Sequence, residues 1–414
     1  MSRSGAVIVG AGQAGVQTAL SLRELGYTKP ITIFNDEGNV PYQRPPLSKG
    51  FMMGKVGREG MRLRSPDQFD RAGISLVADR VEAIDRGARR VIRKSGDHVE
   101  YEALVLATGS RNRTLDVPGS ELEGVLSLRS LDDAEALQQR LKSARDVVII
   151  GGGFIGLEFA AVASKSVARV HVVEAAPRTM ARAVSPEVSA YFTRRHVERG
   201  TTFCFGDTVL GINGRAGQVV SVETATKGAL PADLVLVGVG IVPNSEVAHA
   251  AGLATDNGIV ANEQLLTSDP LISAIGDCAV YPNAFSQSML RVESVQNAVD
   301  HGRTVAARLT GARVSYAAVP WFWSDQGDDK LQIAGISRAG DKWLIKGDEL
   351  DGRFSAFLFR DEALVCVQSV NRVADHMAAR ALLKTGRLGR LTPDTVRANG
   401  FDLKSFAAAD LANA

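Results

Sequence analysis

Cysteine, aromatic residues and net charge are all scarce in this chain. Its 414 residues include three cysteines, three tryptophans and six tyrosines, and 48 basic residues nearly balance 46 acidic ones. The cysteines Cys204, Cys278 and Cys366 lie far apart, which argues against a disulfide framework or a local metal site and favours the reducing cytoplasm. The formal net charge of +2 gives no indication of a nucleic-acid-binding protein. Because no apolar run approaches ~20 residues, we expect no membrane-spanning helix.

What the chain does have is glycine, gathered in two motifs of similar pattern. Residues 10–15 read GAGQAG and residues 151–156 read GGGFIG. Each motif lies between a short apolar run and a helical pattern: 5–9 and 16–25 for the first, 147–150 and 154–165 for the second. We expect each to be the turn from a buried strand to a helix whose N-terminal N–H groups bind a pyrophosphate. Two such turns predict two bound dinucleotides, for which a flavin and a nicotinamide are the natural pair.

The first motif is followed by an acidic residue at the expected place. Gly10 permits the tight turn, Gly12 lets the backbone approach the phosphates, and Gly15 completes the pattern. Asp36 ends the next strand and is expected to bind a ribose hydroxyl, with Asn35 as the alternative. A turn without a ligand is the other interpretation of a lone motif, and the strand, helix and distal acid weigh against it.

The second motif leads to Glu174, at the end of a strand expected over residues 170–173. A carboxylate there binds the ribose 2′-hydroxyl and repels a 2′-phosphate, which favours NADH over NADPH. Arg178 and Arg182 follow closely and could offset that repulsion. Glu158, inside the second helix, lies either near the nicotinamide or on the helix surface, and the sequence leaves both open.

The order of strands divides the chain into three domains. Runs that end in glycine at 104–109 and 234–240 close each nucleotide domain, and residues 267–277 deliver an acid after a glycine. We therefore predict an α/β fold with two Rossmann-like dinucleotide-binding domains and a small C-terminal α+β domain. The predicted bounds are 1–113 and 246–322 for a discontinuous FAD-binding domain, 114–245 for a NAD-binding domain, and 323–414 for the C-terminal domain. Within the last domain we expect strands at 354–359 and 364–367, a helix near 373–385, and a short helix or frayed end at 406–409.

Two further segments have unusual compositions. Residues 41–49 contain three prolines and the cations Arg44 and Lys49, which suit phosphate or flavin oxygens; a proline-rich surface loop is the alternative. Residues 320–326 read PWFWSDQ and hold two of the three tryptophans. They form either a core cluster or a ring system near a flavin that is exposed toward a redox partner, and both can hold.

Taken together, these motifs resemble the FAD-dependent, NADH-using ferredoxin reductases of bacterial cytochrome P450 and Rieske oxygenase systems, especially the putidaredoxin reductase group. The similarity covers nearly the whole chain, with matching segments at 41–49, 107–109, 128–131, 151–158, 174–182, 267–278, 292–295 and 320–326. It implies a glutathione-reductase-like pair of nucleotide domains followed by a C-terminal domain. Asn35 departs from the pattern, because a glycine is common there in relatives.

The resemblance also implies functions for single residues. With the first motif, it gives as FAD-binding residues Gly10, Gly12, Ala14, Gly15, Asp36, Arg44, Lys49, Val81, Ala107, Thr108, Gly109, Arg129, Gly276, Asp277 and Val295. With the second motif, it gives as NAD-binding residues Gly151, Gly153, Phe154, Ile155, Gly156, Glu158, Glu174, Arg182 and Gly240. The expected catalytic residues are Lys49, Glu158, Glu293 and Trp323. Among these, Glu158 is expected to orient the nicotinamide amide, Asp277 to hold the ribityl chain, and Val295 to lie under the pyrimidine end of the flavin.

The implied activity is an electron transfer in two stages. A hydride passes from NADH to FAD, and single electrons then leave for a docked [2Fe–2S] ferredoxin that supplies a cytochrome P450 or similar oxygenase. Arg303, Lys330 and Trp323 are candidate docking residues for an acidic ferredoxin, although solvated surface charge explains the two cations equally well. The alternatives are an apoptosis-inducing-factor-like NADH-binding flavoprotein, a rubredoxin reductase, and a flavin oxidase or disulfide reductase. The absence of cysteine from residues 41–49 argues against a disulfide reductase.

Overall fold

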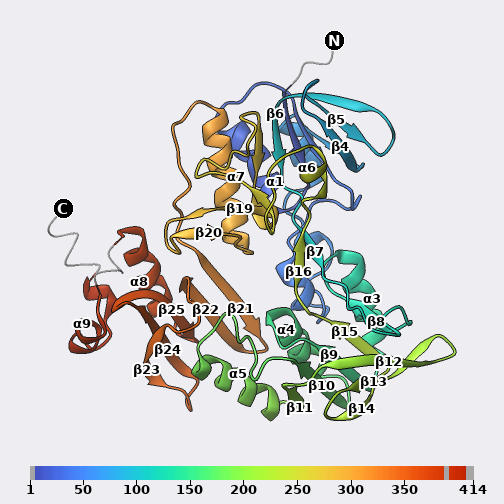
Figure 1. Cartoon of the computed structure of the whole chain (residues 1–414), viewed down its shortest axis with the longest axis vertical. Helices are drawn as coiled ribbons and strands as arrows, with labels where there is room; N and C mark the ends of the chain where they lie inside the picture. The colour runs from blue at the N-terminus through green and yellow to red at the C-terminus, as the bar shows by residue number, and fades with distance from the viewer. Residues whose placement is uncertain (1–4, 387–390, 407–414) are drawn as a thin grey trace. The chain divides into compact units, whose positions relative to one another are not determined.

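The computed structural model describes residues 5–386 and 391–406, which form two compact units (Figure 1). Each unit gathers segments that are distant in the sequence. The first unit draws on Met1–Gln43, Arg58–Arg111 and Ile241–Pro320. The second draws on Arg44–Gly57, Asn112–Gly240 and the chain from Trp321 onward.

The first unit is built on a mostly parallel sheet with the strand order β3-β2-β1-β6, in which β18 also pairs with β6. These strands are β1 (Gly5–Val9), β2 (Ile31–Phe34), β3 (Ile74–Val77), β6 (His98–Leu106) and β18 (Ile272–Ala274). Side chains alternate along β1: Ala6 and Ile8 enter one hydrophobic core, and Val7 and Val9 enter another. Because both faces are buried, the whole of this strand is apolar.

Helices α1 (Gln13–Glu24) and α7 (Val295–Leu309) lie side by side in this unit, in blue and orange in Figure 1. A Cβ on Gly302 would lie 2.9 Å from the carbonyl oxygen of Ala14 and 3.0 Å from the amide nitrogen of Thr18. A glycine at this position therefore lets the two backbones approach closely. The other elements are α2 (Pro66–Arg71), β4 (Val81–Asp85), β5 (Arg90–Arg93), β7 (Ser110–Asn112), β16 (Ile241–Pro243), α6 (Glu246–Ala250), β17 (Ile259–Val260), β19 (Ala279–Asn283), β20 (Ser288–Leu290), and the short 3₁₀ helices η2 (Glu59–Met61) and η3 (Gly276–Cys278).

The second unit repeats this architecture with a parallel sheet of order β11-β10-β9-β15-β8. Its strands are β8 (Val125–Ser127), β9 (Asp146–Ile150), β10 (Arg169–Glu174), β11 (Thr201–Phe205) and β15 (Leu234–Val237). Its helices are α3 (Leu131–Leu141), α4 (Phe154–Ala163), α5 (Pro186–Glu198) and the 3₁₀ helix η1 (Pro45–Ser48). A small antiparallel sheet is added by β12 (Val209–Arg215), β13 (Gln218–Thr224) and β14 (Gly228–Pro231).

The C-terminal part of the same unit is an antiparallel sheet of order β21-β22-β25-β24-β23 with two helices. Its elements are β21 (Trp321–Gln326), β22 (Asp329–Gly335), β23 (Lys342–Asp348), β24 (Arg353–Arg360), β25 (Ala363–Val370), α8 (Val373–Lys384) and α9 (Pro393–Ala398). Leu157 of α4 and Phe192 of α5 share one buried core with Leu331 and Phe354 of this sheet. The C-terminal sheet is therefore packed onto the two helices of the second nucleotide-binding fold.

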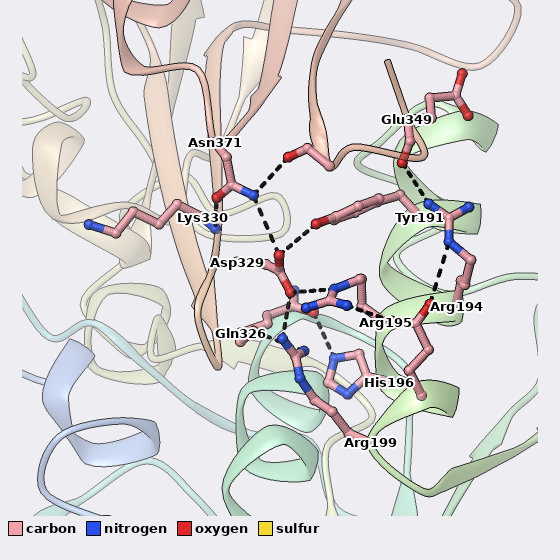
Figure 2. Close-up of polar contacts among 12 residues, drawn as sticks. Tyr191, Arg194, Arg195, His196, Arg199, Gln326, Asp329, Lys330, Glu349 and Asn371 are labelled. Atoms are coloured by element: carbon pink, nitrogen blue, oxygen red, sulfur yellow. Dashed lines mark hydrogen bonds and ion pairs between the residues drawn. The ribbon is translucent and has the colours of Figure 1, made fainter. Parts of the chain in front are cut away.

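A polar cluster around Asp329 reinforces this packing (Figure 2). The Asp329 carboxylate accepts hydrogen bonds from the Tyr191 hydroxyl at 2.5 Å and from Nε of Arg195 at 3.0 Å. Arg199 and Asn371 also donate to it. Burial raises the pKa of Asp329 and the hydrogen bonds from these donors lower it. The net result is a pKa below the usual value for aspartate. Tyr191, Arg195 and the C-cap residue Arg199 thereby tie α5 to the first hairpin of the C-terminal sheet.

The expected fold class is confirmed, with corrections at several element ends. The first helix begins at Gln13 rather than Val16, and the second ends at Ala163. The strand expected over 104–109 ends at Leu106, and that over 234–240 ends at Val237. The glycine-containing residues after each strand form loops, because glycine favours turns over ladder pairing. Residues 403–406 are helical, and the rest of the segment expected over 406–409 lies outside the described residues. The predicted domain bounds stay predictions.

Candidate functional site

The first glycine motif forms a tight strand-to-helix turn after β1. Gly10 has φ of +113°, and a Cβ there would lie 2.2 Å from the carbonyl oxygen of Ala107. A Cβ on Gly15 would lie 2.0 Å from the carbonyl oxygen of Gly10. At Gly12, the N-cap of α1, a Cβ would meet no atom of the described chain within 4 Å. The turn therefore leaves open space at the position where the α1 N–H groups would hold a pyrophosphate.

The second motif has the same geometry after β9. Gly151 has φ of +109°, and a Cβ there would lie 2.4 Å from the carbonyl oxygen of Gly238. A Cβ on Gly156 would lie 2.3 Å from the carbonyl oxygen of Gly151. Within the part of the chain that the structure describes, a Cβ on Gly153, the N-cap of α4, has no neighbour within 4 Å. Both motifs therefore fit a dinucleotide phosphate in the same way.

Glu174 holds the second motif in place as well as facing it. Its Oε2 accepts a hydrogen bond from the Gly152 amide at 2.6 Å, and its Oε1 accepts one from the Ala176 amide at 2.8 Å. The carboxylate is thereby fixed beside the glycine turn with lone pairs remaining on both oxygens. Asp36 follows β2 in the first unit and is exposed, while the side-chain amide of Asn35 donates to the carbonyl of Asn39 at 2.6 Å.

The two arginines after Glu174 differ in their surroundings. Arg178 donates from Nη1 to the carbonyl of Val184 and from Nη2 to that of Ala181, both at 2.9 Å, and burial lowers its pKa. Arg182 is exposed. Of the two arginines, Arg178 thus stabilises its own loop.

Glu158 is the one polar side chain of α4, the helix that follows the second glycine motif. Its side chain is 2% exposed, which excludes the interpretation of a helix-surface acid. Oε2 lies 2.7 Å from Nζ of Lys49 and accepts a hydrogen bond from the Ser48 hydroxyl at 2.5 Å. Oε1 accepts one from the Ser324 hydroxyl at 2.6 Å. Residues from the proline-rich segment and from β21 therefore meet at this carboxylate.

The strand β21 presents different residues on its two sides. Phe322 packs against Phe154 with ring centroids 4.6 Å apart, and Ser324 reaches Glu158, so both contact α4. Trp321 and Trp323 alternate with them, and their ring centroids lie 5.5 Å apart. In the hairpin register, Asp325 pairs with Lys330 and Trp323 with Gln332, which places Trp323 and Lys330 on the same face.

The remaining predicted FAD residues of the second unit are close to one another. Nη1 of Arg44 donates to the carbonyl of Arg129 at 2.5 Å, and the Arg129 amide donates to Asp133 at 2.9 Å. The side-chain amide of Gln138 donates to the carbonyl of Phe51 at 2.8 Å. The proline-rich segment, which includes η1, is thus fixed to the start and body of α3.

In the first unit, Thr108 and Asp277 mark the ends of β6 and β18. Thr108 donates from Oγ1 to the carbonyl of Asn244 at 2.5 Å and accepts at its own carbonyl from the Asn244 side chain at 2.9 Å. The Ser110 hydroxyl donates to Oδ2 of Asp277 at 3.2 Å. Both carboxyl ends of these parallel strands meet at one edge of the sheet, where such folds bind ligands.

The turn that presents Asp277 depends on a buried histidine. Gly276 has φ of +72°, and its amide donates to Nδ1 of His301 at 3.1 Å. A Cβ on Gly276 would lie 3.2 Å from Cβ of Ala14, so this turn and α1 are in contact. Burial lowers the pKa of His301 to about 3, and the neutral ring supplies the acceptor.

Other predicted residues are positioned as follows. Val81 is buried at the start of β4, and Val295 begins α7 after the N-cap Ser294. Glu293 is exposed and pairs with Arg291 at 2.6 Å. Arg303 is exposed on α7, with Asp300 3.6 Å away. Ala107 and Gly109 flank Thr108, and Gly240, with φ of +105°, ends the loop after β15.

Several residues of these sites carried no recognisable sequence signal. Ser48 and Ser324 reach Glu158 from segments far away in the sequence, and His301 contacts Gly276 only through tertiary packing. Isolated serines and histidines have no spacing that would mark them.

The described residues include three cysteines but no cluster of metal ligands. No group of three or more histidine, cysteine or acidic side chains there is arranged to hold a metal ion. All three cysteines are buried free thiols, and burial raises the pKa of Cys366 to about 12. Among the described helices, none is long and apolar enough to cross a membrane.

The chain is similar to known reductases along almost its whole length. Rhodocoxin reductase of Rhodococcus erythropolis is 47% identical over 399 residues, which cover 96% of this chain and 93% of that protein. The ferredoxin reductase for the CYP199A2 system from Rhodopseudomonas palustris has a TM-score of 0.94 at 48% identity, covering 98% of this chain and 100% of that one. A chain of the covalent putidaredoxin reductase–putidaredoxin complex has a TM-score of 0.92 at 37% identity, covering 99% of both.

Two family descriptions match separate parts of the chain. Residues 321–407 match the family described as reductase C-terminal. Residues 5–302 match pyridine nucleotide-disulphide oxidoreductase, and this range contains both glycine motifs and Glu158. The chain therefore belongs to the pyridine nucleotide-disulphide oxidoreductase family and is an oxidoreductase that uses FAD and NAD(H).

Proposed function

We propose that this chain transfers electrons from NADH through FAD to a [2Fe–2S] ferredoxin, which in turn supplies a cytochrome P450 or a similar oxygenase. The observation that carries the proposal is the buried Glu158–Lys49 pair on the helix of the second glycine motif. Relatives covering nearly all of the chain are named as reductases of rhodocoxin and of ferredoxin, and another was crystallised with putidaredoxin. These names support an iron–sulfur protein as the acceptor.

The FAD is proposed to lie along the first glycine motif. Gly10, Gly12, Ala14 and Gly15 form the phosphate turn, and Asp36 accepts from the adenosine ribose. Asp277 binds the ribityl chain from the end of β18. The proposed set also includes Val81, Ala107, Thr108, Gly109, Gly276 and Val295 of the first unit, and Arg44, Lys49 and Arg129 of the second.

The nicotinamide dinucleotide is proposed to bind the second motif. Gly151, Gly153 and Gly156 allow its phosphates to approach the start of α4, and Phe154 and Ile155 line that start. Glu174 accepts from the 2′-hydroxyl and disfavours a 2′-phosphate. Glu158 accepts from the nicotinamide amide, and Arg182 and Gly240 complete the set.

A flavin bound here would supply the redox chemistry, which is the acceptance of a hydride and the release of single electrons. The chain's own part is to position the two dinucleotides, because effective concentration and orientation account for much of such a rate. Lys49 neutralises the buried Glu158, and Glu293 and Trp323 are proposed near the flavin edge. We further propose a cytoplasmic location, which the three buried free thiols support.

The acceptor can be identified by measuring NADH-dependent cytochrome c reduction by the purified flavoprotein. Addition of a [2Fe–2S] ferredoxin should raise the rate in proportion to ferredoxin concentration until it saturates. A rubredoxin tested in the same way shows whether the acceptor is rubredoxin instead of a [2Fe–2S] ferredoxin. If no iron–sulfur protein raises the rate above that of flavoprotein alone, the proposed function is wrong.

A further inference from the structure

The carboxylate of Glu158 ends a chain of buried polar side chains that begins at His196. Nε2 of His196 lies 2.9 Å from Oε1 of Gln326. Nε2 of Gln326 donates to the Ser324 hydroxyl at 3.4 Å, and that hydroxyl donates to Oε1 of Glu158 at 2.6 Å. The four residues come from α5, β21 and α4, and each side chain is nine-tenths or more buried.

The burial and contacts of His196 give this chain one consistent set of hydrogen-bond directions. Burial keeps the His196 ring neutral, with a pKa lowered to about 4. Nδ1 of His196 has no partner among the described residues, so a neutral ring that satisfies Gln326 Oε1 carries its proton on Nε2. Gln326 then presents its NH₂ group to Ser324 Oγ, which directs the hydroxyl hydrogen of Ser324 onto Glu158.

The other oxygen of Glu158 is also occupied. A carboxylate has roughly four lone-pair positions. Oε2 accepts from the Ser48 hydroxyl and lies 2.7 Å from Nζ of Lys49, so two donors use its positions. Among the described residues, Ser324 is the donor to Oε1. One acceptor position on Oε1 is therefore left, and its direction is set by the Ser324 hydroxyl.

We propose that Ser324, held by Gln326 and His196 and assisted by Ser48, is a positioning residue that leaves Glu158 a single oriented acceptor position for the nicotinamide amide. The inference rests on the proposed nicotinamide site at Glu158. It explains how the site selects a ligand with an N–H donor at that point. A ketone in place of the amide brings only an acceptor, and a carboxylate brings a like charge; both leave the remaining acceptor position of Glu158 without a donor.

The test compares the binding of oxidised ligands to the FAD-loaded protein by calorimetry. NAD⁺ has the amide donor, 3-acetylpyridine adenine dinucleotide has a methyl ketone in its place, and ADP-ribose lacks the ring altogether. The wild-type chain should bind NAD⁺ about tenfold more tightly than the acetylpyridine analogue. In Ser324→Ala that ratio should fall to about two, while the Kd of ADP-ribose stays within about twofold.

Ser355→Ala is the matched control. Ser355 is fully buried in the same sheet and bonds to Ser369 and Asp375 instead of Glu158. Its removal should leave the NAD⁺-to-analogue ratio at the wild-type value. Ser324→Thr keeps the hydroxyl and should restore most of the ratio. If Ser324→Ala does not fold, Ser48→Ala decides, since loss of a donor to Oε2 should also lower the ratio.

Three results would overturn the inference: an unchanged ratio in Ser324→Ala, an equal loss of ADP-ribose binding, or no preference for NAD⁺ in the wild-type chain. The measurement needs no electron acceptor. A chain that shows the expected ratios but reduces no ferredoxin would contradict the proposed function while leaving this inference intact.

Discussion

Lys49 and Glu158 form an ion pair in which Nζ of the partly buried lysine lies 2.7 Å from Oε2 of the buried glutamate. Lys49 comes from the proline-rich segment and Glu158 from the helix of the second glycine motif. The side chains are 18% and 2% exposed, so little solvent reaches the carboxylate. Removing one partner of such a pair leaves the other charge uncompensated in the protein interior. The stability of the fold is therefore sensitive to a single substitution at either residue.

The first prediction concerns this pair. Lys49→Met should lower the free energy of unfolding by about 3 kcal/mol, because it leaves a buried carboxylate without its cation. The double variant Lys49→Met/Glu158→Gln should recover part of that loss. Urea unfolding of the FAD-loaded protein measures both. A single variant as stable as the double would show that the pair is not coupled.

The second prediction is that two glycines of one motif serve different purposes, one in folding and the other in nucleotide binding. Gly153→Ala should leave stability nearly unchanged, because a Cβ there meets no atom of the described residues within 4 Å. It should weaken NAD⁺ binding at least tenfold by filling the space at the start of α4. Gly151→Ala should instead destabilise the fold by about 2 kcal/mol or more, because φ is +109° and its Cβ would lie 2.4 Å from the Gly238 carbonyl oxygen. Thermal unfolding and calorimetry distinguish the two effects; equal losses of stability would contradict the argument.

The third prediction concerns coenzyme choice. Glu174→Ala should lower the ratio of kcat/KM for NADH over NADPH about tenfold, because it removes the carboxylate that repels a 2′-phosphate. Glu174→Gln keeps an acceptor for the Gly152 or Ala176 amide and isolates the effect of charge. Arg182→Ala should move the ratio in the opposite direction. An unchanged ratio in both Glu174 variants would remove this residue from coenzyme selection.

The fourth prediction concerns acid stability. His196 is neutral when folded, with a pKa lowered to about 4 by burial, whereas an unfolded histidine titrates near ~6.5. The unfolded chain therefore binds a proton first as the pH falls, so the stabilising contribution is complete above pH ~6.5 and is lost toward pH ~4. Over that window His196 should account for about 3 kcal/mol of lost stability.

The matching experiment compares urea unfolding at several pH values. His196→Gln should make the pH dependence between pH ~6.5 and ~4 shallower by about one proton, since glutamine does not titrate. His98→Gln is the control, because His98 is exposed and should leave the slope as in the wild-type chain. Parallel curves for the wild-type and His196→Gln proteins would contradict the prediction.

The fifth prediction concerns the proposed ferredoxin surface. Lys330→Glu should raise the KM for ferredoxin about fivefold at low salt with little change in kcat, and the difference should shrink as salt is added. Arg303→Glu should act in the same direction. Lys342→Glu, on an exposed lysine of β23, is the charge-matched control. Steady-state rates at two ionic strengths suffice, and equal effects of all three variants would indicate general charge rather than a docking site.

Much of the fold was accessible from local sequence. The two glycine motifs predicted both nucleotide-binding turns, and the structure gives them nearly the same φ angles and close approaches. The family, the FAD and NAD(H) cofactors and the C-terminal α+β region are confirmed. Ends of elements were less accurate, as at Leu106 and Val237, because an apolar run does not show where ladder pairing stops.

The environment of Glu158 could not be predicted from the sequence. From the sequence alone, Glu158 was equally consistent with a residue near the nicotinamide and with an acid on the helix surface. Its burial depends on Ser48, Lys49 and Ser324, which arrive from other segments. Arg178 was similarly ambiguous, and only the packed loop shows that its guanidinium binds the carbonyls of Ala181 and Val184.

By itself, the sequence determined the two dinucleotide-binding turns, because the need for glycine at Gly10 and Gly151 is a property of the local backbone. Only the tertiary structure decided what surrounds Glu158. Hydrogen bonds between α5, β21, η1 and α4 join residues with no fixed spacing in sequence, so no local pattern can encode them. Their geometry exists once the C-terminal sheet packs onto the second nucleotide-binding fold.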